Sequence, residues 1–560
     1  MAKNTQALLF CSLFLTIPKM AATAQITPDN TLDEENSVIT PVDELNDKIE
    51  GGAKRGSNLF HSFREFNIGK GRGVDFVNPS GVENILTRVT GNNLSKILGR
   101  LGVLGEANLF LINPNGIIFG EGARLDVSGS FIATTADGIK LGKQGIFSAS
   151  SPETSNLLSV KPSALFFNQL AAGQIINRSQ VSGLSGERES VGLSVSAGKT
   201  LALIGGEIVL KGGNLTAPGG RIELGSVAGG EEVSLSQVDE DSWVLGYEKV
   251  SAFQDILLKN AKLDVSSNSS GDVQIQGRNL EMNRGSYIFA NNTGDLAGGE
   301  VFVKTTDNLT LSEESKLTAD VYGKGRGNNI TIDTKNLLVK DDSVISAITF
   351  GEGDGGNLDV TAKSIELTGN HPEGLFGSRF TTDSGLITTV GENATGNAGD
   401  INVNTENLLV ENRAQIGSST LGEGDGGSLS VRAETIELLG NEPNIPFPSI
   451  LYTSVGNGIS EIDSKATGNG GNLTIDTDKL FIRNGAAVIS TTLGAGDAGN
   501  LEVNGAELIK LVDETNNSQL RSGLYTNIGV AALGIGLEAT GAGGDLTIET
   551  NKLIVRDGAN

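Results

Sequence analysis

With 560 residues the chain is long enough for a large buried core or for a long series of repeats. Its 77 glycines are about twice the usual share, and 12 prolines without a Gly-X-Y period exclude a collagen. A formal net charge of −25 disfavours a nucleic-acid partner, because phosphate backbones repel an acidic surface. Two histidines and one cysteine leave little room for metal or nucleophile chemistry. The composition therefore favours an acidic, glycine-rich β protein.

Residues 1–24 have the pattern of a secretory signal peptide. Lys3 precedes an apolar run over 7–17, and Ala22-Thr23-Ala24 is a small-residue cleavage site. Cleavage removes Cys11, the single cysteine, so the mature chain cannot form a disulfide within itself. No later segment is apolar over about 18 residues, the length a membrane-spanning helix needs. We therefore expect a soluble protein that leaves the cytoplasm.

The next part of the chain, up to Phe167, carries a distinctive series of motifs. They are Phe63-Arg-Glu-Phe-Asn-Ile, Val77-Asn-Pro-Ser-Gly-Val-Glu-Asn-Ile-Leu-Thr-Arg-Val-Thr-Gly, Gly105-Glu-Ala-Asn-Leu-Phe-Leu-Ile-Asn-Pro-Asn-Gly-Ile-Ile-Phe-Gly and Gly129-Ser-Phe-Ile-Ala-Thr-Thr-Ala-Asp. This series closely resembles the N-terminal two-partner-secretion (haemagglutination activity) domain of filamentous haemagglutinin-like exoproteins. The resemblance implies a capped β-helical secretion domain, with the first coils over 25–270, and an outer-membrane transporter barrel that recognises it.

Two Asn-Pro motifs are hallmarks of that family. Asn113-Pro114-Asn115-Gly116 matches the second motif fully, whereas Asn78-Pro79-Ser80-Gly81 departs from the usual Asn-Pro-Asn-Leu of the first. Proline sets φ near about −65° and Asn-Gly tolerates positive φ, so a strand over 109–112 must turn before one over 117–119. Asn78, Pro79, Asn113, Pro114, Asn115 and Gly116 are therefore our candidate site residues. They act either as corners of a β-helix or as a surface that the transporter recognises.

An internal repeat organises residues 271–560. Similar segments start 71 to 73 residues apart at Asn329, Asp400, Asn472 and Asp545, and a second copy follows 28 residues later at Asn357, Ser428 and Asn500. The strands are short, alternate apolar with polar residues and are separated by glycines. Crossover helices do not fit between them, and a propeller blade of about 40–50 residues fits the spacing poorly.

This pattern predicts an all-β, right-handed parallel β-helix (solenoid), in which inward Ile, Leu and Val stack on their copies in neighbouring coils. At about 24 residues per coil, a 72-residue unit would make about three coils and the mature chain about 22, a rod on the order of 100 Å. The last repeat stops at Asn560 partway through a unit, which indicates a chain cut off within its repeats.

Each unit also carries an insertion, over 371–379, 442–449 and 512–521, and returns to a matching strand at Phe380, Tyr452 and Tyr525. Equal phase predicts that the three loops lie on one face of the rod. There they either contact a surface glycan or protein or are neutral loops that the fold tolerates.

Signals for catalysis are weak throughout. His61 and His371 lie far apart, and the chain has no Gly-x-Ser-x-Gly elbow, P-loop or His-Glu-x-x-His motif. The Gly-Glu-Gly-Asp-Gly-Gly segments at Gly351 and Gly422 look like calcium repeats, but those need tandem nine-residue copies. We therefore expect no catalytic residues, no cofactor and no metal.

Together with the repeat pattern, the resemblance implies a secreted or surface-exposed exoprotein of a two-partner secretion system that acts as an adhesin or a structural surface protein. It would reach the outside through the periplasm of a Gram-negative-type cell, with the transporter barrel and a surface glycan or protein as partners. One alternative is a secreted polysaccharide-active β-helix enzyme. Another is an autotransporter passenger, which the repeat at the C-terminus disfavours.

Overall fold

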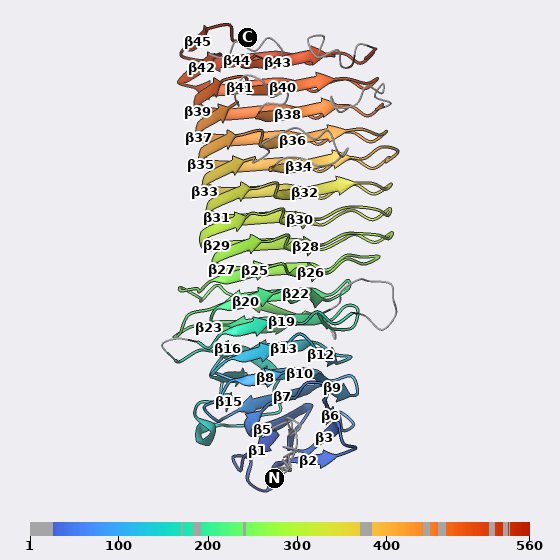
Figure 1. The fold of residues 1–560 in the computed structure, drawn as a ribbon, viewed down its shortest axis with the longest axis vertical. Coiled ribbons are helices and arrows are strands. Elements are labelled where there is room, and N and C mark those ends of the chain that lie inside the picture. The colour runs from blue at the N-terminus through green and yellow to red at the C-terminus, as the bar shows by residue number, and fades with distance from the viewer. Residues whose placement is uncertain are drawn as a thin grey trace, which may run out of the picture.

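The computed structural model describes residues 26–169, 172–182, 192–238, 242–369, 384–440, 449–456, 466–513, 521–529, 536 and 538–560. Within these residues there is no α-helix, and the two short 3-10 helices are η1 (Asp33–Glu35) and η2 (Pro152–Thr154). The strands wind into a parallel β-helix that rises as a rod from the N-terminal to the C-terminal end (Figure 1). The predicted all-β parallel β-helix is confirmed, whereas the signal peptide predicted over 1–24 lies outside the described residues.

The main sheet contains one strand from every coil, and neighbours along the chain pair in parallel. In order these strands are β5 (Asn58–Phe66), β7 (Asn84–Val89), β10 (Asn108–Ile112), β13 (Phe131–Thr134), β19 (Thr200–Gly205), β22 (Arg221–Ser226), β27 (Asp272–Asn283), β29 (Glu300–Leu311), β31 (Asn329–Lys340), β33 (Leu358–Thr368), β35 (Ile401–Glu411), β37 (Leu429–Leu439), β39 (Leu473–Arg483), β41 (Leu501–Ala506) and β44 (Leu546–Thr550). The described chain therefore has fifteen such levels, which at about 4.8 Å each make a rod of roughly 70 Å.

A second series of strands flanks the first. It comprises β8 (Ser95–Ile97), β11 (Ile117–Phe119), β17 (Ile175–Asn177), β20 (Ile208–Lys211) and β25 (Ile256–Lys259). β25 pairs with the second half of β27, so from β27 to β39 one long strand replaces two short ones. In the last two coils β42 (Leu508–Val512) and β45 (Leu553–Arg556) are again separate short strands. The strands of the repeats are thus longer than the alternation alone suggests.

The remaining face of the rod is formed by two further sheets. The lower one contains β6 (Gly73–Val77), β9 (Arg100–Leu104) and β12 (Arg124–Asp126). The upper one contains β18 (Leu193–Ser194), β21 (Leu215–Thr216), β26 (Lys262–Asp264), β28 (Tyr287–Phe289), β30 (Lys316–Thr318), β32 (Val344–Thr349), β34 (Gly385–Val390), β36 (Gln415–Thr420), β38 (Ile450–Val455), β40 (Ala487–Thr492) and β43 (Gly523–Ile528). Every coil therefore wraps the same interior.

Antiparallel strands cap the N-terminal end of the rod. β1 (Ile26–Pro28) and β4 (Ala53–Arg55) pair with the first main strand, β5. The hairpin of β2 (Ser37–Pro41) and β3 (Asn46–Gly51) extends the lower sheet below β6. A cap of this kind covers apolar surface of the first coil, which has no coil below it to pack against.

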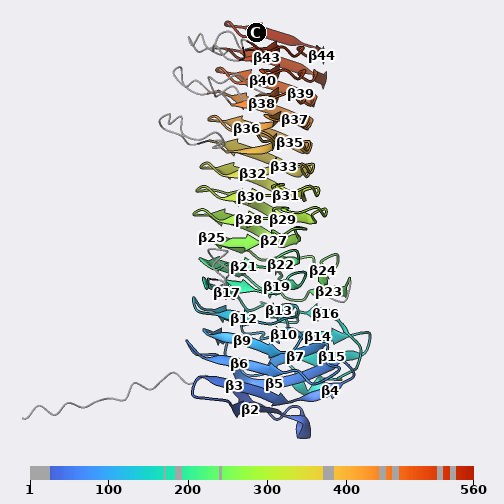
Figure 2. The ribbon, with the colours of Figure 1, turned by 90° about the vertical axis from the view of Figure 1, so that its right-hand side faces the viewer.

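A separate antiparallel sheet, here called the side sheet, lies outside the rod against the main sheet (Figure 2). Its strands lie in the order β15 (Gly145–Ser148), β14 (Gly138–Leu141), β16 (Pro162–Phe166), β23 (Glu232–Gln237) and β24 (Trp243–Gly246). Outward apolar residues of the main sheet, among them Phe60, Leu86 and Phe110, pack with it in a second hydrophobic core. The sequence pattern did not predict this sheet.

The interior of the rod consists of stacked aliphatic side chains, as predicted. Ile330, Leu358, Ile401, Leu429 and Leu473 occupy the same position in five successive coils, and each is fully buried. Stacking buries each side chain against its equivalents above and below, so hydrophobic stabilisation accumulates along the rod.

The predicted three coils per 72-residue unit are wrong, because a unit makes two. The two copies of the repeat, at Asn329 and Asn357 for example, lie in the same column one coil apart. Successive coils are alternately 28 and about 43–45 residues long, which explains both spacings seen in the sequence. β31 is one strand of 12 residues, where the sequence pattern predicted shorter strands, so fewer and larger coils result.

The predicted insertion loop over 371–379 lies outside the described residues, and of the loops over 442–449 and 512–521 only residues 449, 512–513 and 521 are described. The strands that follow them fix the register. Tyr452 and Tyr525 occupy one column, two coils apart, as their shared partner Ile489 shows. In β34 that position belongs to Ile387 and not to Phe380, which lies outside the described residues, so the predicted equivalence of Phe380 is wrong.

Polar side chains tie one glycine-rich turn to the next. Asp354 Oδ1 accepts the Asn397 N–H at 2.9 Å, Asn397 Oδ1 accepts the Asp425 N–H at 2.8 Å, and Asp425 Oδ1 accepts the Asn469 N–H at 2.7 Å. Asn469 Oδ1 in turn accepts the Asp497 N–H at 3.0 Å. The alternation of Asp and Asn keeps carboxylates two coils apart, which reduces the repulsion that directly stacked charges would suffer.

Glycine is required where backbones of neighbouring turns touch. A Cβ atom on Gly471 would overlap the carbonyl oxygen of Gly427 in the coil below. The adjacent Gly470 has no such neighbour, since a Cβ there would lie 3.4 Å from its nearest atom, an ordinary contact distance.

We expect Gly471→Ala to lower the free energy of unfolding by about 1–3 kcal/mol, because the added methyl group forces two stacked turns apart. The matched control, Gly470→Ala, should leave it within about 0.5 kcal/mol. Urea unfolding followed by circular dichroism measures both variants. Equal midpoints for the two would contradict the close approach of the turns.

Candidate functional site

The fully matching motif forms the corner between β10 and β11. The Asn113 carbonyl accepts the Gly116 N–H at 3.1 Å, which closes a four-residue turn, and Gly116 has a φ of +120° that favours glycine. The Asn113 side chain is fully buried. Its Nδ2 donates to the Asn93 carbonyl at 3.0 Å and to Ser95 Oγ at 2.9 Å, while its Oδ1 accepts the Asn115 N–H at 3.0 Å.

Asn115 is the exposed residue of this corner, since Pro114 and Gly116 are buried with Asn113. The Asn115 Nδ2 donates to the Gly91 carbonyl at 2.8 Å in the preceding coil. The corner is therefore a joint between two coils. Its accessible chemistry is that of a single side-chain amide.

The first motif forms a corner between β6 and β7 that is open to solvent. The Pro79 carbonyl accepts the Val82 N–H at 3.1 Å, and Gly81 has a φ of +75°. Lys54 Nζ, from the cap, donates to the Ser80 carbonyl at 2.7 Å. Pro79, Ser80 and Gly81 are exposed.

Asn78 connects this corner to the coil above it. In the orientation that satisfies its neighbours, its amide donates to the Val82 carbonyl and accepts the Ala107 N–H, both at 3.3 Å. Its side chain also lies against Gly105, where a Cβ atom would collide with it. The two asparagines that begin the motifs therefore do similar work, each fastening its corner to an adjacent coil.

The structure does not bring the two corners together. The first leads into the start of β7, whereas the second follows the end of β10, and these two strands pair from Asn84–Asn108 to Arg88–Ile112. A strand of five residues at about 3.3 Å each separates the corners by roughly 15 Å. A partner that contacts both must cover the width of the main sheet.

A ladder of buried asparagines, missed in the sequence, marks the start of the first main strands. Asn84 Nδ2 donates to Asn58 Oδ1 at 3.2 Å, and Asn108 Nδ2 donates to Asn84 Oδ1 at 3.0 Å. Asn108 Oδ1 then accepts the Ser130 N–H at 2.8 Å. The signal was present in the recurring Asn-apolar-apolar triplets at Asn58, Asn84 and Asn108.

Arg88 is a second residue that the sequence analysis missed. Its fully buried guanidinium donates to Thr31 Oγ1 at 2.7 Å, to Ser62 Oγ at 2.9 Å and to the Ser148 carbonyl at 2.7 Å. It also lies 4.5 Å from the ring centroid of Phe147. Burial lowers the pKa of Arg88 to about 10, so it stays charged at neutral pH. One side chain thus joins the cap, the main sheet and the side sheet.

His61 lies in the core beneath the cap. Its Nδ1 is 3.0 Å from Ser37 Oγ, and its ring packs near Phe63 and Phe76. Burial lowers the pKa of His61 to about 3, so the ring is neutral at pH 7. The second histidine, His371, lies outside the described residues.

In the parts of the chain that the structure describes, no group of three or more His, Cys, Asp or Glu side chains is placed to hold a metal ion. The same parts contain no helix that is long and apolar enough to span a membrane.

We expect Asn113→Ala to lower the free energy of unfolding of the N-terminal domain by about 1–3 kcal/mol, because buried partners lose their hydrogen bonds. Asn115→Ala removes an exposed amide and should cost less than about 1 kcal/mol. Fluorescence of Trp243, the single tryptophan, follows urea unfolding locally, because it is buried in the side sheet near Phe110. A larger effect for Asn115→Ala would contradict this assignment.

Acid should destabilise the cap through His61. The unfolded chain takes up the proton near its ordinary pKa of about 6.5, whereas the folded state resists protonation until about pH 3. The free energy of unfolding therefore falls as the pH drops from 6.5 towards 3. We expect the Trp243-detected urea midpoint to fall less between pH 7 and about pH 4.5 in His61→Gln than in the wild type. An identical fall in both proteins would contradict the assignment.

Known proteins are similar to the N-terminal part of this chain. Residues 24–275 match the family model of the TPS secretion domain, where TPS denotes two-partner secretion. Two curated relatives, both heme/hemopexin-binding proteins of Haemophilus influenzae, are 39% identical over 83 residues and 38% over 85 residues. Each alignment spans 15% of this chain and 9% of the relative, so the chain matches less than a tenth of their length.

Solved structures of secretion domains are also similar. The HMW1 secretion domain from Haemophilus influenzae has a TM-score of 0.49 at 17% identity, covering 86% of this chain and 100% of that one. The filamentous hemagglutinin secretion domain has a TM-score of 0.28 at 16% identity, covering 60% of this chain and 96% of that one. The family match agrees with the motifs of the first 170 residues, and it confirms the resemblance of residues 24–275 to the TPS secretion domain.

Proposed function

We propose that this chain is an exoprotein whose N-terminal domain addresses it to an outer-membrane transporter barrel and whose rod then acts outside the cell as an adhesin or structural surface protein. The observation that carries the proposal is the family match over residues 24–275. Heme and hemopexin binding are named for the two relatives, and because the alignments span 9% of those proteins we do not transfer these activities.

The two parts of the chain suit successive stages of export. The secretion domain closes over long sequence distances, since Asn58 bonds to the Leu158 carbonyl, 100 residues away, and Thr200 bonds to Ser130, 70 residues away. The repeats, in contrast, pair coil by coil with their immediate neighbours. Such a rod can fold progressively as it leaves a pore, and no disulfide in the mature chain would lock it beforehand.

Within the Asn-Pro corners we assign different roles to buried and exposed residues. Asn113, Pro114 and Gly116 are buried, so they act on export through the shape of the first coils. Asn115, Pro79 and Ser80 are exposed and are the candidates for direct contact with the transporter. Both roles use the same corners, which lie on opposite ends of paired strands.

We also propose that the protein has no catalytic role. A polysaccharide-cleaving site needs carboxylates together with a proton donor on an accessible face. The histidine that the structure describes, His61, is buried beneath the cap and lowered in pKa by that burial. Adhesion requires only an exposed binding surface, which a long rod offers along its length.

Export of the full chain from a Gram-negative host tests the proposal. We expect the protein in the medium only when the candidate transporter, usually encoded nearby, is co-expressed. Asn113→Ala should reduce export in step with its loss of stability, while Asn115→Ala should reduce export without that loss. The control Asn402→Ala, an exposed asparagine of the rod, should be exported normally. Equal amounts in the medium with and without the transporter would contradict the two-partner route.

A further inference from the structure

The outward face of the main sheet changes character where the side sheet ends. One outward column runs through Phe110, Ile132, Ala202, Glu223 and Gln274 in successive coils. The first three pack under the side sheet, whereas Glu223 is the first polar residue and is still fully buried. The border between covered and open sheet therefore lies between β22 and β27.

Phe302 breaks the polar pattern beyond this border. The column continues from Gln274 through Phe302 to Thr331, Asp359 and Asn402, and then through Ser430, Thr474, Glu502 and Thr547. Phe302 is the single apolar residue of this column from β27 to the last described coil. An aromatic ring on an otherwise polar face, next to a cavity, suggests contact with a ligand.

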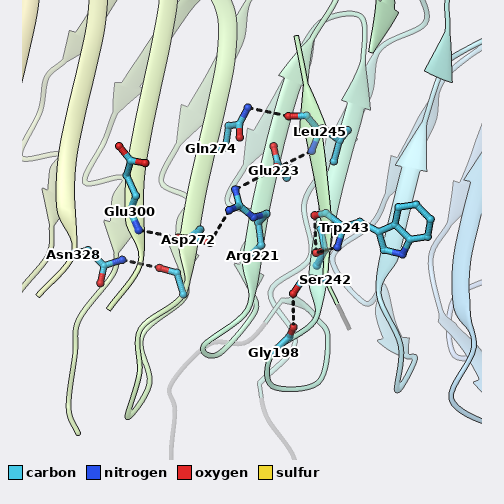
Figure 3. A network of polar contacts seen from close by, with 12 residues as sticks. Gly198, Arg221, Glu223, Ser242, Trp243, Leu245, Asp272, Gln274, Glu300 and Asn328 are labelled. Carbon is cyan, nitrogen blue, oxygen red and sulfur yellow. Dashed lines mark hydrogen bonds and ion pairs between the residues drawn. The ribbon is translucent and has the colours of Figure 1, made fainter. Parts of the chain in front are cut away.

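The edge of the side sheet is held rigidly at this place. The Trp243 N–H donates to Thr200 Oγ1 at 2.9 Å, and the same hydroxyl donates to the Trp243 carbonyl at 2.9 Å. The Leu245 N–H donates to Glu223 Oε1 at 3.5 Å, and Gln274 Nε2 donates to the Leu245 carbonyl at 3.2 Å (Figure 3). Side chains of the rod thus take the place of a further strand beside β24 and close its edge.

A pocket of about 390 Å³ lies between this edge and the open sheet of β22, β27 and β29. Its volume is at the small end of the roughly 300–1,000 Å³ typical of ligand pockets. Gln274, Gln276 and Phe302 line its rod side, and Glu248 and Glu300 lie at its margin. The pocket is therefore large enough for a small ring-shaped ligand.

The charges at its floor compensate each other. Arg221 Nη2 lies 2.7 Å from Asp272 Oδ2, and its Nη1 lies 3.3 Å from Glu223 Oε1 (Figure 3). Burial raises the pKa of Glu223 to about 8, so this carboxyl is largely neutral at pH 7. A cation would lose its hydration here without gaining a free buried counter-charge, and an anion would be repelled by the carboxylates of Glu248 and Glu300. The pocket therefore favours a neutral ligand.

Gln276 supplies an unused amide. It is 7% exposed, lines the pocket, and has no hydrogen-bond partner for its side chain among the described residues. A primary amide offers both donors and an acceptor, so its natural partner is a group with the same dual capacity. Sugar hydroxyls have this capacity, and the C–H face of a pyranose ring is apolar enough to lie on Phe302.

We propose that this pocket binds one neutral pyranose unit of a glycan, with the ring on Phe302 and the hydroxyl groups on the amides of Gln274 and Gln276. The inference rests on the proposed adhesive role and adds to it a ligand class and a place on the rod. The pocket lies at the junction of the secretion domain with the repeats, since its walls come from β22 to β29.

Binding to the purified full chain tests the proposal, with lactose, maltose, mannobiose and chitobiose as probes. Saturation-transfer NMR and isothermal titration should detect at least one of them on the wild type. Phe302→Ala and Gln276→Leu should weaken that binding at least about tenfold, because they remove the ring contact and the unpaired amide. The control Phe481→Ala removes a partly exposed phenylalanine of β39, also on the main sheet but outside the pocket, and should bind normally.

Three results would overturn the proposal: no binding of any of the four sugars, unchanged binding in both pocket variants, or preferential, salt-sensitive binding of a hexalysine peptide. Unfolding midpoints followed by Trp243 fluorescence identify a variant that merely fails to fold. Export measured in parallel separates this inference from the proposed function. Loss of sugar binding in Phe302→Ala and Gln276→Leu, with normal transporter-dependent export of both variants, supports the pocket. Failed export of a wild-type protein that still binds sugar contradicts the export route alone.

Discussion

Each coil of this rod lies on the previous one at the spacing of hydrogen-bonded strands, so every residue meets the residue at the same position one coil away. Aliphatic side chains gain from this repetition, as the buried stack from Ile330 to Leu473 demonstrates. Backbone contacts between turns admit only glycine, as at Gly471 over Gly427. Charged residues are tolerated in stacked turns where a neutral partner intervenes, as Asn397 does between Asp354 and Asp425.

In the secretion domain, contacts between residues that are distant in sequence are added to the contacts between neighbouring coils. The cap, the main sheet and the side sheet meet at Arg88, whose guanidinium bonds to all three. One outward column of the main sheet is apolar where the side sheet covers it, from Phe60 to Ala202, and becomes polar at Glu223. We expect a domain built this way to fold as a unit, and the repeats beyond it to fold one coil at a time.

This difference in folding is the physical basis of the proposed export. The buried Asn113 and the ladder of Asn58, Asn84 and Asn108 hold the first coils in register by side-chain bonds that apolar stacking cannot supply. The exposed groups at the Asn-Pro corners remain accessible for the proposed contact with the transporter. The border at Glu223 leaves a compensated, neutral floor beside an open face, and the proposed sugar pocket follows from that position.

The sequence by itself determined the parallel β-helix and the secretion domain. The alternation of apolar and polar residues, the spacing of glycines and the Asn-Pro motifs are local patterns that are visible in the sequence alone. Only the tertiary structure decided that a 72-residue unit makes two coils, since nothing local shows whether the chain turns after Thr334 or continues. It also decided which apolar residues face outward under the side sheet. Phe110 and Leu109 are equally apolar in the sequence, and only packing separates the second core from the first. Arg88 was missed for the same reason, because its partners Thr31 and Ser148 are distant in sequence and meet it only in the fold.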